Sequence, residues 1–318
     1  GAVWGAAALC RERPTAATRN AVIRAIDFFL RNSRALPDVG VMPVFPVTDE
    51  VKTGSVALIS LAVIEFVRGQ EEEMTVAGRG LYDTWLGQYL EAMQSLELDD
   101  GSWAAYYSLA EKRPIPESTP YADGECLLAY CRAARYMGRD DLVPKIEART
   151  EQLIRKYITG PWKNELDAEE TKQFFQWGCL AFAEYVEAGW KDADTVADAA
   201  LAMAWWMIHE HRVLMRTRNT GYAVEGLLAA YRIARNRGNT HAAEQLRPVI
   251  ERLLVTLTAL QIGGPLQEVH DTVADYSRHP VVKGGILDRQ DSDWIRIDIV
   301  QHQMHAALMA LDLLFPQD

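Results

Sequence analysis

The stretch Gly221-Tyr-Ala-Val-Glu-Gly-Leu-Leu-Ala-Ala-Tyr-Arg232 begins with glycine and continues with small and apolar residues on nearly every side of a helix. A helix that is apolar all round must be buried by other elements. Similar stretches begin at Gly54, Gly124 and Gly178, and a fifth, without the glycine, runs from Ile297 to Leu314. We interpret this recurrence as an internal repeat.

Each buried stretch has a more amphipathic partner helix with charged residues on one side. These partners are expected at about 77–96, 140–156, 190–212 and 240–260, and at 15–32 ahead of the first repeat. An amphipathic helix covers a buried one from outside. We therefore predict an all-α fold, an α/α toroid of about five to six helical hairpins, in a single domain over 1–318, with Ala2–Cys10 as part of another inner helix.

An open α-solenoid would show a similar alternation without closing into a ring. Solenoid repeats tend to be uniform and joined by short loops. Here the connections into the buried helices are long and rich in aromatic and polar residues, at 36–53, 99–120 and 263–294, whereas a connection on the other side is as short as 137–139. Long loops gathered at one end are typical of an active face, which favours the closed ring.

The composition narrows the class of partner. The 318 residues are 49% hydrophobic and 24% charged, as in an ordinary globular protein, and the net charge is −11. Because phosphate neutralisation needs a concentrated basic face, the lack of a Lys/Arg-rich run argues against a nucleic-acid partner. No apolar run approaches the ~18–20 residues that span a bilayer, so we expect no membrane span. The four cysteines are expected to be buried free thiols.

The first residues, Gly1-Ala2-Val3-Trp4, lack the basic and apolar segments of a signal peptide. We expect a periplasmic or extracellular location if a leader has been trimmed, and a cytoplasmic one otherwise. The oligomeric state is not predicted.

Three segments resemble the (α/α)-toroid, or six-hairpin, carbohydrate-active enzymes. They are Tyr121-Ala-Asp-Gly-Glu-Cys-Leu-Leu-Ala-Tyr130 with Tyr136-Met-Gly-Arg-Asp-Asp-Leu142, similar to inner-helix openings, and Trp294-Ile-Arg-Ile-Asp-Ile-Val-Gln-His302, similar to the last inner helix. This group includes glycosidases, polysaccharide lyases, sugar 2-epimerases and uronate C5-epimerases. The resemblance covers most of the chain as architecture and matches no single family's catalytic signature.

A second resemblance concerns Gln94 ahead of Asp100-Gly-Ser-Trp103, which is similar to the Gln…Gly-x-Trp repeat of terpenoid-cyclase and prenyltransferase toroids. That motif is structural in its family and ties a helix end to the next turn. The Asp-rich D-D-x-x-D run of a diphosphate–Mg²⁺ site is missing from the sequence. A terpenoid enzyme is therefore the third hypothesis, and it predicts an apolar central cavity.

In a toroid the N-termini of the inner helices line the cleft, so the residues that open each repeat are site candidates. Tyr121, Asp123 and Glu125 form the first group. Asp123 is either a helix N-cap or a substrate contact. Glu125 is expected in the first turn, where the helix dipole would lower its pKa.

A dense polar run, Asp288-Arg-Gln-Asp-Ser-Asp-Trp-Ile-Arg-Ile-Asp298, leads into the last buried helix. One of Asp291 and Asp293 is expected to cap this helix. Arg296 and Asp298 are expected either to face the cleft or to pair with each other. At least one of Asp293, Arg296 and His302 is a functional candidate.

Aromatic residues gather in or beside the loops on one end: Trp103, Tyr106, Tyr107, Trp162, Trp177, Tyr222 and Trp294. The CH faces of sugar rings stack on such planes, but large aromatics also plug the end of a helical core. Arg216 and Arg218 precede the fourth repeat, where cations are unfavourable for the helix dipole. A uronate carboxylate or a phosphate would relieve that clash, and the alternative is that they are solvated loop charges.

Metal and cofactor signals are weak. His302 and His305 share a helix face but no zinc-type spacing supplies the remaining ligands, and His209-Glu-His211 is expected to be a solvated helix end. The sequence contains no G-x-x-x-x-G-K-[ST] or G-x-G-x-x-G motif. We predict no metal and no cofactor.

The leading hypothesis is an enzyme that acts on a polysaccharide or oligosaccharide, and uronate-containing glycans are among the candidate substrates. Hydrolysis would pair Glu125 or Asp123 with Asp293 across the ring. Lyase or epimerase chemistry would use a base, with Tyr107, Tyr121 and His302 as candidates, and Arg296 or Arg218 would neutralise a substrate carboxylate. The second hypothesis is a non-catalytic toroid that binds a glycan or a partner protein.

Overall fold

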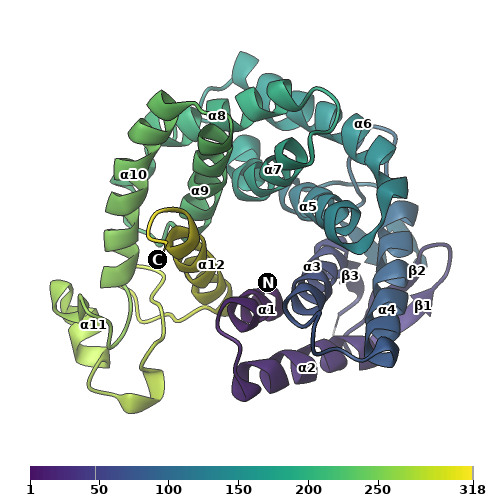
Figure 1. Cartoon of the computed structure of the whole chain (residues 1–318), viewed down its shortest axis with the longest axis horizontal. Coiled ribbons are helices and arrows are strands. Elements are labelled where there is room, and N and C mark those ends of the chain that lie inside the picture. Colours follow the sequence, from purple (N-terminus) through teal and green to yellow (C-terminus); the bar gives the residue numbers. More distant parts are fainter. Residues whose placement is uncertain (47, 317–318) are drawn as a thin grey trace.

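Two concentric rings of helices form the molecule (Figure 1). The computed structural model describes residues 1–46 and 48–316. The inner ring consists of α1 (Ala2–Glu12), α3 (Thr53–Gly69), α5 (Pro120–Met137), α7 (Glu169–Ala188), α9 (Gly221–Asn236) and α12 (Ile297–Leu313). Each packs on the next in that order, and α12 packs on α1, so the ring is closed. The predicted toroid is confirmed, and the open solenoid is wrong.

The outer ring consists of α2 (Ala16–Arg31), α4 (Val76–Ser95), α6 (Val143–Ile154), α8 (Ala193–His209) and α10 (Thr240–Ala259). Each outer helix buries one face, as in α2, where Val22, Ile26 and Leu30 repeat every four residues. Most residues of α3, α5, α7 and α9 are buried, as in α3, where every residue from 59 to 67 is buried. By contrast, α1 and α12 bury fewer than half of their residues, so the predicted burial on all sides is wrong for the stretch 297–314. Residues 2–12 supply the sixth inner helix, as the sequence suggested for Ala2–Cys10.

Two of the repeat glycines lie inside their helices, where they allow close helix approach, whereas Gly221 begins α9 and Gly54 is the second residue of α3. A Cβ on Gly226 of α9 would meet the Phe175 ring of α7, and one on Gly124 of α5 would meet Trp177 of α7. The prediction that each repeat begins at its glycine is therefore wrong for two helices. α5 begins at Pro120, capped by Thr119, and α7 begins at Glu169, well ahead of Gly178.

Short strands occupy the long loops, which the sequence pattern did not predict. β1 (Ser33–Leu36) pairs with β2 (Gly40–Pro43), and β4 (Tyr106–Ser108) pairs with both β3 (Glu50–Lys52) and β5 (Arg113–Ile115), all antiparallel. The second sheet joins the loop before α3 to the loop before α5. The long loop before α12 carries the short helix α11 (Asp271–Tyr276), beside α10 in Figure 1.

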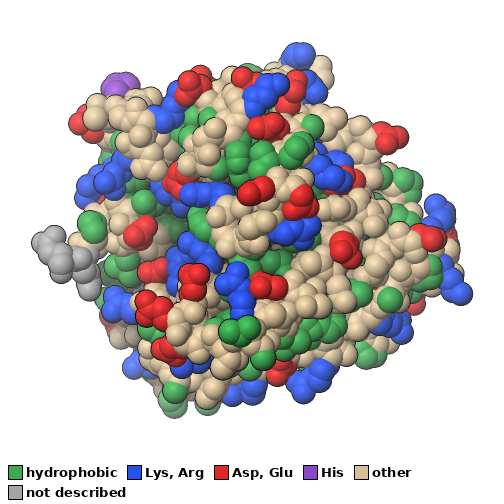
Figure 2. Space-filling model, turned by 45° about the vertical axis from the view of Figure 1, so that its right-hand side comes forward, with side chains coloured by type: hydrophobic (Ala, Val, Ile, Leu, Met, Phe, Trp, Pro, Cys, Tyr) green, Lys and Arg blue, Asp and Glu red, His purple; other side chains and the backbone are tan. Residues whose placement is uncertain are grey.

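Acidic and basic side chains are interspersed over the face shown in Figure 2, with hydrophobic side chains between them. Such mixing is typical of a solvated surface. All four cysteines are buried free thiols, as predicted. No helix in the described part of the chain has the length and apolar character needed to cross a membrane.

Candidate functional site

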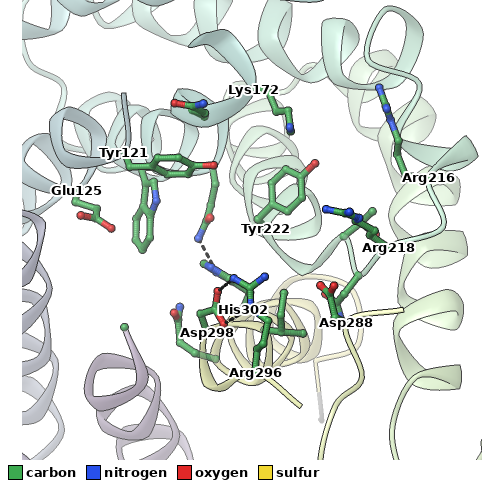
Figure 3. A pocket seen from close by; sticks show the side chains of 18 of the residues that line it. Tyr121, Glu125, Lys172, Arg216, Arg218, Tyr222, Asp288, Arg296, Asp298 and His302 are labelled. Atoms are coloured by element: carbon green, nitrogen blue, oxygen red, sulfur yellow. Dashed lines mark hydrogen bonds and ion pairs between the residues drawn. The ribbon is translucent and has the colours of Figure 1, made fainter. Parts of the chain in front are cut away.

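A cavity of about 730 Å³ opens at the end of the ring where the inner helices begin. We call it the main cavity. Its wall comes from α5, α7, α9 and α12, together with the loops that precede α9 and α12 (Figure 3). The candidates that line it are Tyr121, Glu125, Trp177, Arg218, Tyr222, Arg296 and His302. Stretches far apart in the sequence therefore meet in one site, because the inner helices all enter the ring from the same end.

A buried carboxylate orients His302 at the base of the main cavity. Glu225 of α9 is fully buried, whereas the His302 side chain is 17% exposed. His302 Nδ1 lies 2.8 Å from Glu225 Oε2, and Gln176 Nε2 of α7 donates to the same oxygen over 2.7 Å. Because a carboxylate only accepts hydrogen bonds, His302 Nδ1 carries a proton, and in the neutral form of the ring Nε2 then has a free lone pair. No side chain in the described residues hydrogen-bonds Nε2, so it can act as a base.

A second histidine with the same kind of support lines the main cavity. His211 is buried, stacks on Trp206 with ring centroids 5.3 Å apart, and places Nδ1 2.8 Å from Asp167 Oδ1. The prediction of a solvated helix end is correct for the exposed His209 and wrong for His211. His211 is buried by tertiary structure, because the chain turns inward after α8 and Trp206 covers the imidazole. Burial lowers the pKa of His211, against the raising effect of Asp167.

Glu125 faces the main cavity from α5. Burial raises its pKa to about 8, so the carboxyl group is mostly protonated at neutral pH. The predicted lowering by the helix dipole is wrong, because α5 begins five residues earlier, at Pro120, and desolvation dominates. Gly54 of α3 makes room for this carboxyl group, since a Cβ there would overlap it. A largely protonated carboxyl group and the His302 imidazole thus share one cavity.

Basic residues line the side of the main cavity opposite Glu125 in Figure 3. Lys172, Arg216 and Arg218 lie there, with Tyr222 between them and the centre. Arg218 forms no ion pair within the described residues. Burial raises the pKa of Tyr222 to about 12, so it remains a neutral hydroxyl donor.

Arg296 and Asp298 pair with each other and also line the main cavity, so the two arrangements that the sequence posed as alternatives occur together. Arg296 Nη2 lies 2.6 Å from Asp298 Oδ2. A spacing of two residues allows this contact because Arg296 is the extended N-cap residue of α12 rather than part of the helix. No side chain caps α12, so the predicted cap by Asp291 or Asp293 is wrong.

Asp123 and Trp103 lie behind the cavity wall. The Asp123 carboxylate accepts hydrogen bonds from the Trp103 amide over 2.8 Å and from the Tyr157 hydroxyl. Burial raises the pKa of Asp123 to about 6, against the lowering effect of these bonds. Asp123 is not the N-cap, a position that Thr119 holds. Trp103 is fully buried under Arg149, in agreement with a structural role for the Gln…Gly-x-Trp resemblance.

The other five candidates do not line the main cavity. Tyr107 is buried in β4 and donates to the Pro37 carbonyl, and Tyr106 lies beside it. Trp162 donates to Thr171 and packs near Trp206. Asp293 is exposed, as is Trp294, which is 69% exposed on the loop before α12. The structure therefore does not bring Asp293 and Asp123 together at one cavity.

Acidic, basic and amide side chains make up most of the residues that line the main cavity, alongside apolar and aromatic ones. Lys172, Arg216, Arg218, Asp288 and His302 are among its charged or titratable residues. Among the described residues, the main cavity does not have the purely apolar lining that a terpenoid enzyme predicts. Nor do these residues include a group of three or more His, Cys, Asp or Glu side chains placed to hold a metal ion.

Solved structures of sugar-converting enzymes resemble this chain. A D-mannose isomerase superposes with a TM-score of 0.65 at 11% identity, over 98% of this chain and 87% of the isomerase. A sugar epimerase from a ruminal bacterium gives 0.55 at 12% identity, over 79% of this chain and 73% of the epimerase. The chain shares their fold. No protein-family model matches the sequence, and no curated protein sequence matches it.

Proposed function

We propose that the protein is an isomerase or epimerase of a small reducing sugar, with His302 as the base that removes the proton at C2. The observation that carries the proposal is the His302 imidazole in the wall of the main cavity, with Nδ1 held by the buried Glu225 and Nε2 left without a side-chain partner in the described residues. In an open-chain aldose, the C2 hydrogen is acidic because it lies next to the C1 carbonyl. Removing it needs a positioned base near neutral pH, which is the usual role of histidine.

Glu125 supplies the matching acid. When the C2–H bond breaks, its electron pair forms the C1=C2 bond and negative charge develops on O1. The protonated Glu125 carboxyl group donates its proton to O1, which gives a neutral enediol. Return of a proton to C1, while the ionised Glu125 takes the proton from O2, gives the ketose. Return of a proton to the opposite face of C2, while Glu125 takes back the proton from O1, gives the epimer. His211, held by Asp167, is the second imidazole available for that return.

The size of the main cavity favours a small sugar over a polymer interior. A volume of about 730 Å³ lies within the range of small-ligand pockets. Of the tryptophans proposed as platforms along a polymer, Trp177 lines the cavity, whereas Trp103 and Trp162 pack elsewhere. The similar structures, which are named as an isomerase and an epimerase, also support a small sugar as the substrate.

The basic side of the cavity extends the substrate range to uronic acids. Arg216, Arg218 and Lys172 lie across the cavity from Glu125 (Figure 3). A sugar whose C1–C2 end reaches His302 and Glu125 would direct its far end toward these cations. A carboxylate at that end would pair with Arg218.

The test is a panel of neutral aldoses and uronic acids incubated with the purified protein and followed by ¹H NMR. We expect at least one sugar to give a ketose or a C2 epimer. His302→Asn should lower kcat/KM about 10²–10⁴-fold, the usual contribution of a general base. His241→Asn, at an exposed position on α10, is the matched control and should be unchanged.

Three results would contradict the proposal. Cleavage of a glycosidic bond would indicate a hydrolase, and an unsaturated product would indicate a lyase. Sugar binding without conversion would indicate a binding protein.

A further inference from the structure

Glu225 separates two cavities inside the ring. The first is the main cavity, which His302 lines. The second has a volume of about 140 Å³ and is lined by Glu225 itself, by His305 and by Trp4. His305 is one turn after His302 on α12, so both imidazoles reach the same carboxylate from one helix face.

The two oxygens of Glu225 serve different histidines. Oε2 accepts from His302 Nδ1 and from Gln176, whereas Oε1 lies 3.0 Å from His305 Nδ1. Three donors from two helices therefore surround a carboxylate that has no exposed surface. A buried carboxylate needs such partners, because losing one leaves an unsatisfied acceptor that costs about 1–3 kcal/mol or more.

The protonation state of His305 follows from its surroundings. Its Nε2 is buried and has no hydrogen-bond partner in the described residues, and it lies against Gly5 and the Trp4 ring. A proton on Nε2 would create an orphaned buried donor, whereas a bare lone pair is tolerated more readily. These contacts place the single proton of a neutral His305 ring on Nδ1, directed at Glu225. Gln301 Nε2 lies 3.2 Å from the same Nδ1, so this assignment requires the Gln301 amide to turn its oxygen toward His305.

We infer that His305 is a positioning residue that fixes the tautomer of His302 through Glu225. By occupying Oε1 with a neutral donor, His305 stops the carboxylate from rotating and keeps Oε2 on His302 Nδ1–H. The lone pair of His302 Nε2 then stays in the main cavity. The role in catalysis rests on the proposed function, whereas the role in setting the tautomer does not.

A neutral donor suits this position better than a cation. When His302 takes a proton, the imidazolium pairs with the Glu225 carboxylate, and a second positive charge on Oε1 would oppose that step. The charged groups that line the second cavity around His305 come from every packed inner helix except α7. They are Arg11 and Glu12 of α1, Glu65 of α3, Arg132 of α5, Arg232 of α9 and Asp312 of α12.

The arginines among these charged groups form ion pairs with glutamates other than Glu225. Arg132 Nη1 lies 2.7 Å from Glu65 Oε2, and Arg11 also pairs with Glu65. Arg232 Nε lies 2.7 Å from Glu187 Oε1. No hydrogen bond or ion pair joins these arginines to Glu225 in the described residues. His305 is therefore the partner that Oε1 has on this side of the ring.

The experiment uses ¹⁵N NMR of histidine-labelled protein, which reports which ring nitrogen carries the proton. In the wild type, both His302 and His305 should show a protonated Nδ1 and a bare Nε2. Two variants of similar size separate the hydrogen bond from packing. His305→Asn keeps an N–H group near the Nδ1 position, and His305→Leu fills the space without a donor.

We expect His302 to keep its single tautomer in His305→Asn and to show a mixture in His305→Leu. In a sugar-conversion assay, kcat should fall at least about tenfold in His305→Leu with little change in KM, and His305→Asn should restore most of it. Wild-type His305 protonated at Nε2 would overturn the inference, even if the leucine variant does not fold. An unchanged His302 tautomer in a folded His305→Leu would also overturn it. Failure to convert any sugar, with the expected tautomers, would instead overturn only the proposed function.

Discussion

Replacing Glu125 by glutamine should make the protein more stable at alkaline pH. Burial raises the pKa of Glu125 from its ordinary 4.5 to about 8. Between these two values the unfolded chain releases the proton while the folded protein keeps it. Stability is therefore highest below pH 4.5 and falls as the pH rises toward 8. Each pH unit in this window lowers the free energy of unfolding by about 1.36 kcal/mol, so the full loss is on the order of 5 kcal/mol. The loss is smaller where water in the cavity solvates the ionised carboxylate.

Glu125→Gln keeps the shape and the donor but cannot ionise, so it removes this pH-dependent loss. Urea denaturation of the two proteins at pH 4, 6, 7 and 9 measures the difference directly. We expect similar free energies of unfolding at pH 4 and a growing advantage for the variant above it, which levels off beyond pH 8. If the free energies of unfolding of the two proteins changed with pH in parallel, Glu125 would ionise as easily in the folded protein as in the unfolded chain. That result would contradict its proposed role as a neutral acid.

Two further predictions concern the packing of the rings. Gly226→Ala should lower the free energy of unfolding by about 1–3 kcal/mol in urea denaturation, because the added Cβ meets the Phe175 ring. Gly80→Ala, on the exposed side of α4, has open space for its Cβ and should raise the free energy of unfolding by about 0.5–1 kcal/mol. Equal effects at the two glycines would contradict the close approach of α7 and α9. Glu184→Gln should cost about 3–5 kcal/mol at pH 7, because it strands the guanidinium groups around a buried carboxylate. Burial alone would raise the pKa of Glu184, but these arginines hold it at about 2, so the wild type should lose this stability as the pH falls below 4.5 toward 2 and the variant should not. A wild type and variant that lose stability equally in acid would contradict this pairing.

The ring could be predicted from the sequence because burial on all sides of a helix leaves a direct pattern. The Gly221–Arg232 stretch needs partners all round, and a closed inner ring provides them. The predicted helix start is correct for Gly221 and within one residue for Gly54, but it is wrong for Gly124 and Gly178. Their actual role, close contact between neighbouring helices, depends on side chains from distant segments. The strands were missed because β3, β4 and β5 have three residues each, too few for alternation to be visible.

The site could be predicted in part. His302, Tyr222 and Arg218 were found because they lie where inner helices begin, and the toroid places those ends together. Glu225 was missed although a signal was present, since a single carboxylate within an otherwise apolar helix must have partners. His211 could not have been found in this way, because its burial depends on a turn of the chain after α8 that local pattern does not show.

The most direct test of the proposed role of His302 is solvent exchange at C2 of the converted sugar. The reaction is run in D₂O and the C2 proton signal is followed by NMR for the wild type and for His302→Asn. If His302 Nε2 removes that proton, the wild type should place deuterium at C1 or C2 of the product, and the variant should slow this exchange about 10²–10⁴-fold. Product formed without deuterium at either carbon, or exchange at the wild-type rate in the variant, would contradict proton removal by His302.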